Sequence, residues 1–127
     1  MNETSKPIID YGDLADHWIQ RVKEIGPLLE ATAGEGEKIR ELTQESMDAL
    51  HEHKLFRMLL AKKAGGEELP LPVFCRVIEA IAKYDGSAAW CVGQGSGCSM
   101  LGAYLDSEIS SKIWGDNTNG VLAWGPG

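Results

Sequence analysis

The chain has 127 residues, of which 43% are apolar and 24% are charged, and this length and composition suit one globular domain. Its 12 basic and 19 acidic residues give a net charge of −7. This balance argues against nucleic acid and against an anionic membrane surface as partners, because both need a basic face. The first residues lack the apolar core of an export signal, so we expect a cytoplasmic protein.

The pattern from residue 13 onward predicts amphipathic helices. We expect residues 1–12 to form a flexible lead-in and Asp13 to cap a first helix, in which Pro27 causes a kink or a restart. The GEGE stretch at 34–37 should end this helix. Apolar residues recur at steps of three and four and should form one face of this helix: Leu14, Trp18, Val22, Ile25 and Leu28 or Leu29.

Residues 38–53 form the second expected helix, and an apolar connector rich in leucine follows it up to a turn at Gly65 and Gly66. A third helix should begin at Pro70 or Pro72, since proline suits the first helical turn. Its inward residues are expected to be Leu71, Phe74, Val77, Ile78 and Ile81.

Ser87 is expected to cap a fourth helix, and Asp106 a fifth that ends at Gly115. Residues 121–124, with the sequence VLAW, are typical of the start of a β-strand that has no partner in the chain. The sequence therefore predicts an all-α bundle of about five helices over residues 13–120, followed at 121–127 by the start of a β-domain.

The stretch 86–105 contains no charged residue, and three interpretations compete for it. A membrane span has the right length but would contain too many small and polar residues. A phosphate-binding loop would need glycine at position 98, where the chain has Cys98, and a strand before the glycines. We favour a fully buried helix, because each internal glycine costs about 1 kcal/mol unless close packing or a ligand uses the space.

On such a helix Trp90, Gln94 and Cys98 share one face with Leu101. An aromatic ring, an amide and a thiol among small residues suggest the wall of a substrate pocket. A plain central core helix is the alternative interpretation. No catalytic residue and no metal site can be assigned from the sequence.

Cysteine and histidine usage gives no sign of metal binding. Cys75, Cys91 and Cys98 are odd in number and lack zinc-site spacing, so we interpret them as reduced, buried thiols. His51 and His53 are two residues apart and point about 200° apart on a helix, which prevents joint chelation. We expect them to lie at a solvated helix end, and His17 to lie on the surface.

Residues 53–97 resemble the N-terminal helical domain of the acyl-CoA dehydrogenase superfamily. The resemblance lies in Leu55-Phe56, Ala61-Lys62-Lys63, Gly65-Gly66, Leu69, Phe74, Val77-Ile78-Glu79 and the run Asp85 to Trp90. The DGS-AW combination is closest to the branch of flavin-dependent, two-component monooxygenases, which hydroxylate aromatic substrates with flavin reduced by a separate reductase. The resemblance implies FAD or FMN in the complete enzyme and a small apolar, aromatic or acyl substrate.

The family's architecture also implies what this chain should lack. Members have a helical domain, a β-barrel and a C-terminal helical bundle, and the flavin lies mainly between the last two. We therefore expect no cofactor in this chain alone. Several aromatic hydroxylases of the branch carry a histidine near the flavin where this chain aligns Cys98, and a thiol does not replace an imidazole at neutral pH.

The leading functional hypothesis is a substrate-side helical domain of a flavin-dependent oxidoreductase, either a dehydrogenase or an aromatic hydroxylase, that is not catalytic alone. The complete enzyme is expected to be a homo-oligomer. The alternative hypothesis is a free-standing helical binding or assembly module derived from that domain.

Overall fold

The computed structural model describes residues 9–115 and 119–126, and all regular structure within them is helical. The main helices are α1 (Gly12–Ile39), α2 (Gln44–Glu52), α3 (Leu71–Ala82), α4 (Gly86–Ser99) and α5 (Ser107–Ser110). Shorter turns of helix complete the chain: η1 (Leu55–Arg57), η2 (Lys62–Ala64), η3 (Met100–Ala103) and η4 (Ser111–Gly115). The predicted all-α bundle of five helices is confirmed. The strand predicted at 121–124 is not, because the described residues 119–126 have no regular structure.

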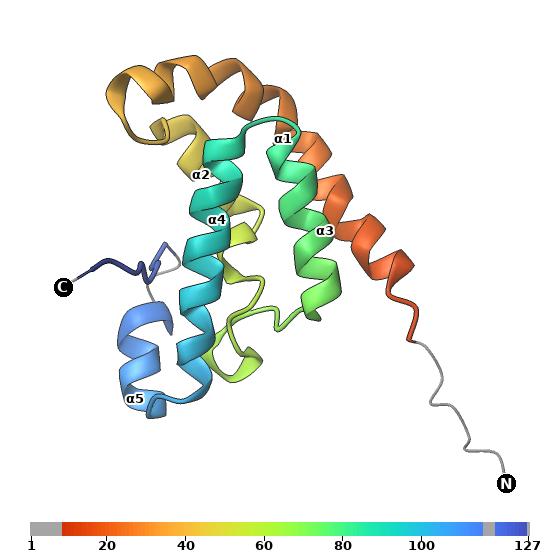
Figure 1. Ribbon diagram of the computed structural model, residues 1–127. Coiled ribbons are helices and arrows are strands. Elements are labelled where there is room, and N and C mark those ends of the chain that lie inside the picture. Colours follow the sequence, from red (N-terminus) through yellow and green to blue (C-terminus); the bar gives the residue numbers. More distant parts are fainter. Residues whose placement is uncertain (1–8, 116–118, 127) are drawn as a thin grey trace, which may run out of the picture.

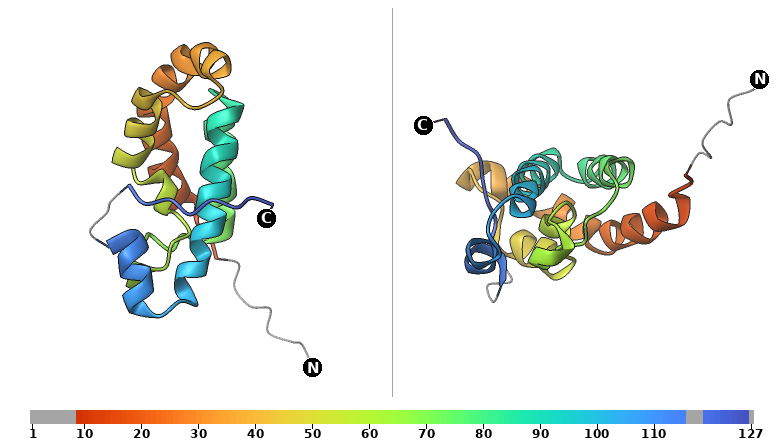
Figure 2. Two further views of the ribbon diagram at one scale, coloured as in Figure 1. Left: turned by 90° about the vertical axis from the view of Figure 1, so that its left-hand side faces the viewer. Right: turned by 90° about the horizontal axis from the view of Figure 1, so that it is seen from below.

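The helices pack in a simple order. α3 and α4 lie side by side and run in opposite directions, and α1 packs against α3 and crosses behind the layer that these two helices form (Figures 1 and 2). The connector with η1 and η2 packs under α4, and α5 lies beside the lower end of α4 (Figures 1 and 2). This order leaves one face of α4 without a helical neighbour among the described residues.

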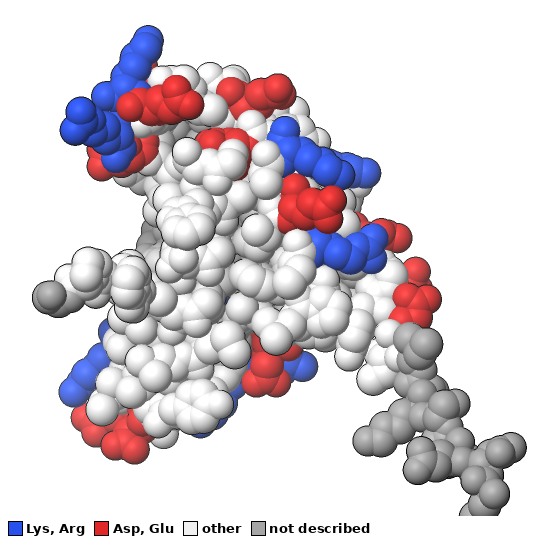
Figure 3. Space-filling view, in the orientation of Figure 1, with Lys and Arg blue, Asp and Glu red and all other residues white. Residues whose placement is uncertain are grey.

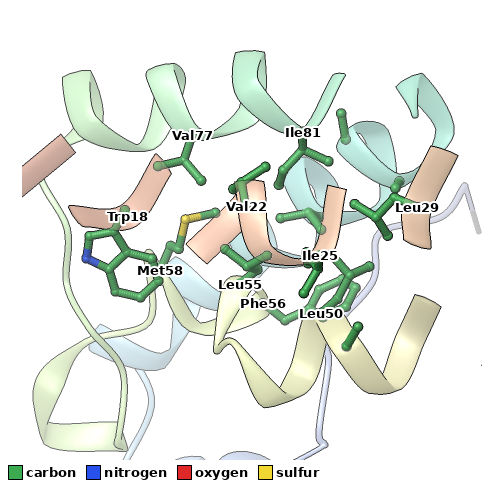
Figure 4. Packing of buried hydrophobic residues seen from close by; sticks show 14 of the residues in the cluster. Trp18, Val22, Ile25, Leu29, Leu50, Leu55, Phe56, Met58, Val77 and Ile81 are labelled. Carbon is green, nitrogen blue, oxygen red and sulfur yellow. The ribbon is translucent and has the colours of Figure 1, made fainter. Parts of the chain in front are cut away.

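The core joins one stripe of α1 and the apolar connector to the inward faces of α2, α3 and α4 (Figure 4). Trp18, Val22, Ile25 and Leu29 of α1 are buried as predicted, whereas Leu14 is exposed. The leucine-rich connector is a packed segment, also as predicted. Its fully buried side chains are Leu55, Met58 and Leu60.

The boundaries of α1 differ from the prediction. Tyr11 rather than Asp13 precedes the helix, and Asp13 lies in its first turn, where its charge suits the helix dipole. The helix continues through Pro27 without a restart and bends along its course (Figure 1). It also continues through the GEGE stretch. At Gly36 the missing side chain lets Glu41 donate its N–H to the Gly36 carbonyl at 3.2 Å, so the chain turns there.

α2 is shorter than the predicted 38–53. It begins after Thr43, whose Oγ1 accepts the backbone N–H of Ser46 at 3.2 Å. Ser46 is buried, and its Oγ lies 2.6 Å from Oγ1 of Thr32 in α1, which ties the two helices together. The true start of α2 is therefore fixed by a capping hydroxyl that the apolar pattern did not identify.

α3 begins at Leu71, as the two prolines predicted, and Val73, Val77 and Ile81 form its buried stripe. Leu71 is exposed, contrary to the prediction. The connector turns at Gly65, which has a φ of 93°, as expected. A Cβ on Gly66 would collide with the carbonyl of Leu60, so only glycine fits there.

The prediction of buried thiols is wrong. Cys75 and Cys91 are exposed and Cys98 is half-buried, and all three are free. Cys75 is exposed because it lies two residues from both Val73 and Val77, which puts it on the opposite face of α3. The predicted lead-in falls largely on residues 1–8, outside the described residues, and the domain boundaries at 12 and 120 stay predictions.

Candidate functional site

α4 has an inner face that packs on the connector. This face starts where Asp85 accepts the backbone N–H of Ser87 at 2.9 Å, so Asp85 and not Ser87 caps the helix. Ser96 is fully buried and donates its hydroxyl to the carbonyl of Leu55 at 3.1 Å. The buried residues of the face are small or β-branched: Ala88, Ala89, Val92, Gly95, Ser96 and Ser99.

The outer face of α4 is open, so the prediction of a fully buried helix is wrong. Trp90 is 68% exposed, and Gly97 and Leu101 are exposed as well, while Gln94 is half-buried. In Figure 3 the surface over α4 is almost free of charged side chains along the length of the helix. An apolar, uncharged surface of this kind is typical of a binding face.

Two glycines of α4 show the contrast between its faces. A Cβ on Gly95 would lie 2.8 Å from Cγ1 of Val121 and 2.9 Å from Cδ1 of Phe56, so packing within the chain requires glycine there. A Cβ on Gly97 would meet no atom within 4 Å. Packing against the described residues therefore explains Gly95 and leaves Gly97 unexplained.

Trp90 and Gln94 line the same groove, with a volume of about 820 Å³. The groove lies between α4, the residues around the end of α1, and the C-terminal segment that crosses α4 at Gly95 (Figure 2). Trp124, which is 73% exposed, forms another part of its wall. Two indole rings and the side-chain amides of Gln94 and Gln44 are thus brought to one concave surface.

Cys98 does not share this groove with the other two predicted residues. It lines a neighbouring apolar groove of about 500 Å³, together with Leu101 and Tyr104. Ala123 and Trp124 line both grooves and so form the wall between them. The structure therefore brings Trp90 and Gln94 together and puts Cys98 on the other side of the C-terminal segment.

A third cavity, of about 460 Å³, lies at the start of α4 and is lined by Trp90, Cys91 and Asp85. Although Cys91 is exposed, its partial desolvation and, to a smaller extent, the negative charge of Asp85 raise the pKa of its thiol. The thiol is therefore protonated at neutral pH and is a weak nucleophile.

The histidines have structural partners rather than the predicted solvated surroundings. The ring of His51 lies 4.8 Å from that of Phe56, and Nε2 of His53 lies 3.2 Å from Oε2 of Glu24. His17 is exposed, as expected. Among the described residues no group of three His, Cys, Asp or Glu side chains is placed to hold a metal ion. No helix in the described part of the chain is long and apolar enough to cross a membrane.

Two residues of the groove were missed by the sequence reasoning. Trp124 lies in the predicted strand, and nothing in its spacing linked it to Trp90. Arg40 lines the groove from the residue after α1, which depends on α1 continuing through the GEGE stretch. The one signal in the sequence was an aromatic residue, Trp124, in a segment expected to have no partner in the chain.

Comparison with known proteins gives related sequences, although no family model matches the chain. Indole-3-acetate monooxygenase of Pseudomonas putida is 35% identical over 95 residues, which cover 75% of this chain and 24% of that protein. Indole-3-acetate monooxygenase of Acinetobacter baumannii is 30% identical over 128 residues, which cover 98% of this chain and 31% of that protein. The oxygenase subunit HsaA of a flavin-dependent monooxygenase from Rhodococcus jostii is 28% identical, over 80% of this chain and 26% of that subunit.

Solved structures share the fold. XiaF from Streptomyces, determined in complex with FADH2 and glycerol, superposes with a TM-score of 0.79 at 24% identity, over 84% of this chain and 27% of XiaF. The 3-HSA hydroxylase from Rhodococcus sp. RHA1 superposes with a TM-score of 0.73 at 27% identity, over 80% of this chain and 26% of that enzyme.

These matches confirm the resemblance stated from the sequence. The fold is that of the N-terminal helical domain of the acyl-CoA dehydrogenase superfamily. Within that class, the chain is homologous to the oxygenase components of flavin-dependent two-component monooxygenases. The matched parts span 24% and 31% of the length of the two indole-3-acetate monooxygenases.

Proposed function

We propose that this chain is the substrate-side helical domain of a flavin-dependent monooxygenase oxygenase component, and that it is not catalytic alone. The observation that carries the proposal is the uncharged outer face of α4, where Trp90 and Gln94 line one groove with Trp124. In this role the indoles contact an aromatic substrate and Gln94 can donate to or accept from its polar group. Cys98 lines an adjoining part of the wall.

The described residues do not suit a flavin held by this chain alone. A flavin dinucleotide presents phosphates that need several donors or cations. The groove offers one guanidinium, from Arg40, and the first turn of α4 is already capped by Asp85. We therefore propose that FAD or FMN is held by further parts of the complete enzyme. The contribution of α4 is an apolar wall that keeps water away from the reacting centre.

The test is an NMR titration of the purified chain with indole-3-acetate, the compound in the names of two relatives. The four tryptophans give four indole N–H signals, assigned with single Trp→Phe variants. We expect the signals of Trp90 and Trp124 to shift. Those of the buried Trp18 and Trp114 serve as internal controls and should stay in place. Shifts in no signal, or equal shifts in all four, would contradict the proposal.

The lack of independent catalysis has its own measurement. Purified chain mixed with FAD or FMN, a flavin reductase and indole-3-acetate should show no product formation and should retain no flavin after gel filtration. Bound flavin with turnover would overturn the domain assignment.

A second candidate function is an assembly module that uses the outer face of α4 as a contact surface. The exposure of Trp90 in one groove, and of Leu101 and Tyr104 in the adjoining groove, favours it. Gel filtration separates the candidates. A module should run as a compact homo-oligomer of defined size, whereas a substrate-side domain on its own should show no oligomer of defined size.

A further inference from the structure

One basic side chain lines the groove between Trp90 and Trp124. Arg40 belongs to its wall, and no other Lys or Arg among the described residues does. The remaining polar side chains of the wall are those of Gln44, Gln94 and Glu41. The groove thus combines two aromatic rings with a single guanidinium.

Arg40 is placed by the end of α1. Its backbone has a φ of 61°, the left-handed region that closes many helices, and its N–H is donated to the carbonyl of Gly36. The side chain of Arg40 is exposed, and none of the four ion pairs found among the described residues includes it. The Arg40 guanidinium is therefore available to a ligand.

We propose that Arg40 is a specificity-determining residue that binds the carboxylate of an aromatic acid whose ring packs against Trp90 and Trp124. This inference rests on the proposed function and adds the charge of the substrate and the residue that recognises it. A guanidinium pairs with a carboxylate through two parallel hydrogen bonds. In a chain with a net charge of −7, an anionic ligand needs such a local cation.

Glu41 restricts how the acid can lie. Its carboxylate lines the same groove and repels a second carboxylate. The acid group therefore has to face Arg40, which directs the aromatic ring along α4 toward Gln94. A neutral ligand of the same shape lacks this constraint and gains nothing from Arg40.

The experiment compares indole-3-acetate with indole-3-acetamide, which has the same ring and a neutral side group. Both are titrated into the full 127-residue chain, and the dissociation constants are taken from the Trp90 indole N–H shift. We expect Arg40→Gln to weaken the binding of indole-3-acetate about tenfold, the loss of one charge-assisted contact. Binding of indole-3-acetamide should change less than about twofold. Arg40→Lys should restore part of the loss.

Lys54→Gln is the matched control. Lys54 is a basic residue with the same left-handed backbone, at a φ of 59°, and it lies outside the groove. Its replacement should leave both dissociation constants unchanged. Arg40 follows the last turn of α1, so its charge also complements the helix dipole. The unfolding midpoint of each variant is therefore measured as well, to separate a loss of stability from a loss of binding.

The outcomes separate the two proposals. Binding of both ligands with no effect of Arg40→Gln would overturn the role of Arg40 and leave the proposed function standing. Equal weakening of both ligands would show a structural role for Arg40 and would also overturn the inference. Failure of both ligands to bind the unmodified chain would overturn the proposed function and this inference together.

Discussion

The two faces of α4 belong to one helix and one uncharged stretch of sequence, yet one is closely packed and the other is open to solvent. The inner face is packed so closely that Gly95 has no room for a Cβ and Ser96 must donate its hydroxyl to the connector. The outer face carries a largely exposed tryptophan and a glycine with empty space beside it. The inner face therefore stabilises the fold, and the outer face is available for a ligand or partner.

The largest test of this contrast uses two tryptophans. Trp114 is 1% exposed and packs near Gly102 of η3, the turn that follows α4, whereas Trp90 is 68% exposed. Trp114→Ala should lower the free energy of unfolding by about 3–5 kcal/mol, because it leaves a large cavity. Trp90→Ala should change it by less than about 0.5 kcal/mol. Urea denaturation followed by circular dichroism measures both. Trp114→Phe, with a smaller cavity, should fall between them, and similar losses for Trp114→Ala and Trp90→Ala would erase the distinction.

The two glycines give a test of intermediate size. Gly95→Ala forces its new methyl group against Val121 and Phe56, and we expect a loss of about 1–3 kcal/mol from overpacking. Gly97→Ala adds a methyl group in open space and should stabilise the isolated chain by about 0.5–1 kcal/mol through better helix propensity. The same denaturation experiment applies. Equal effects of the two substitutions would show that the C-terminal segment does not pack on α4 as described.

The smallest expected effect is on the pH dependence of stability, through His51 of α2, whose ring packs on Phe56 of the connector. Burial and, after it, the charge of Arg57 lower the pKa of His51, although Asp48 opposes them. His51 is thus more easily protonated in the unfolded chain, so stability is full above a pH of about 6.5 and falls as the pH drops toward the lowered pKa. His51→Gln and His51→Phe should both flatten this decline in melting temperatures measured between pH 7.5 and 5.5. An unchanged slope in both variants would remove His51 as its source.

The interior of the bundle could be predicted because it follows from local periodicity. The spacing of Trp18, Val22, Ile25 and Leu29 identified the buried face of α1, and Gly65 identified the turn. The family was also recognisable, since the motifs from Leu55 to Trp90 occur in the expected order. These features depend on residues close together in sequence, where side-chain volume and backbone freedom act directly.

The candidate site could be predicted only in part. Trp90 and Gln94 are one helical turn apart, so their shared groove follows from the period of the helix. That they line a pocket for a substrate stays a prediction, as does the role of Cys98. Arg40 and Trp124 come from distant segments, and no spacing in the sequence brings them to α4.

The sequence by itself determined an all-helical domain, its apolar stripes and its superfamily, because helix periodicity and turn residues act locally. The tertiary structure alone decided that α1 continues through two glycines, that the cysteines lie near the surface, and which face of α4 is covered. For α4 the physical reason is that residues 86–105 contain no charged side chain. The sequence therefore does not show which face of the helix is turned toward the core and which toward solvent. The contacts of Gly95 with Phe56 and of Ser96 with Leu55 determine which face of α4 is buried.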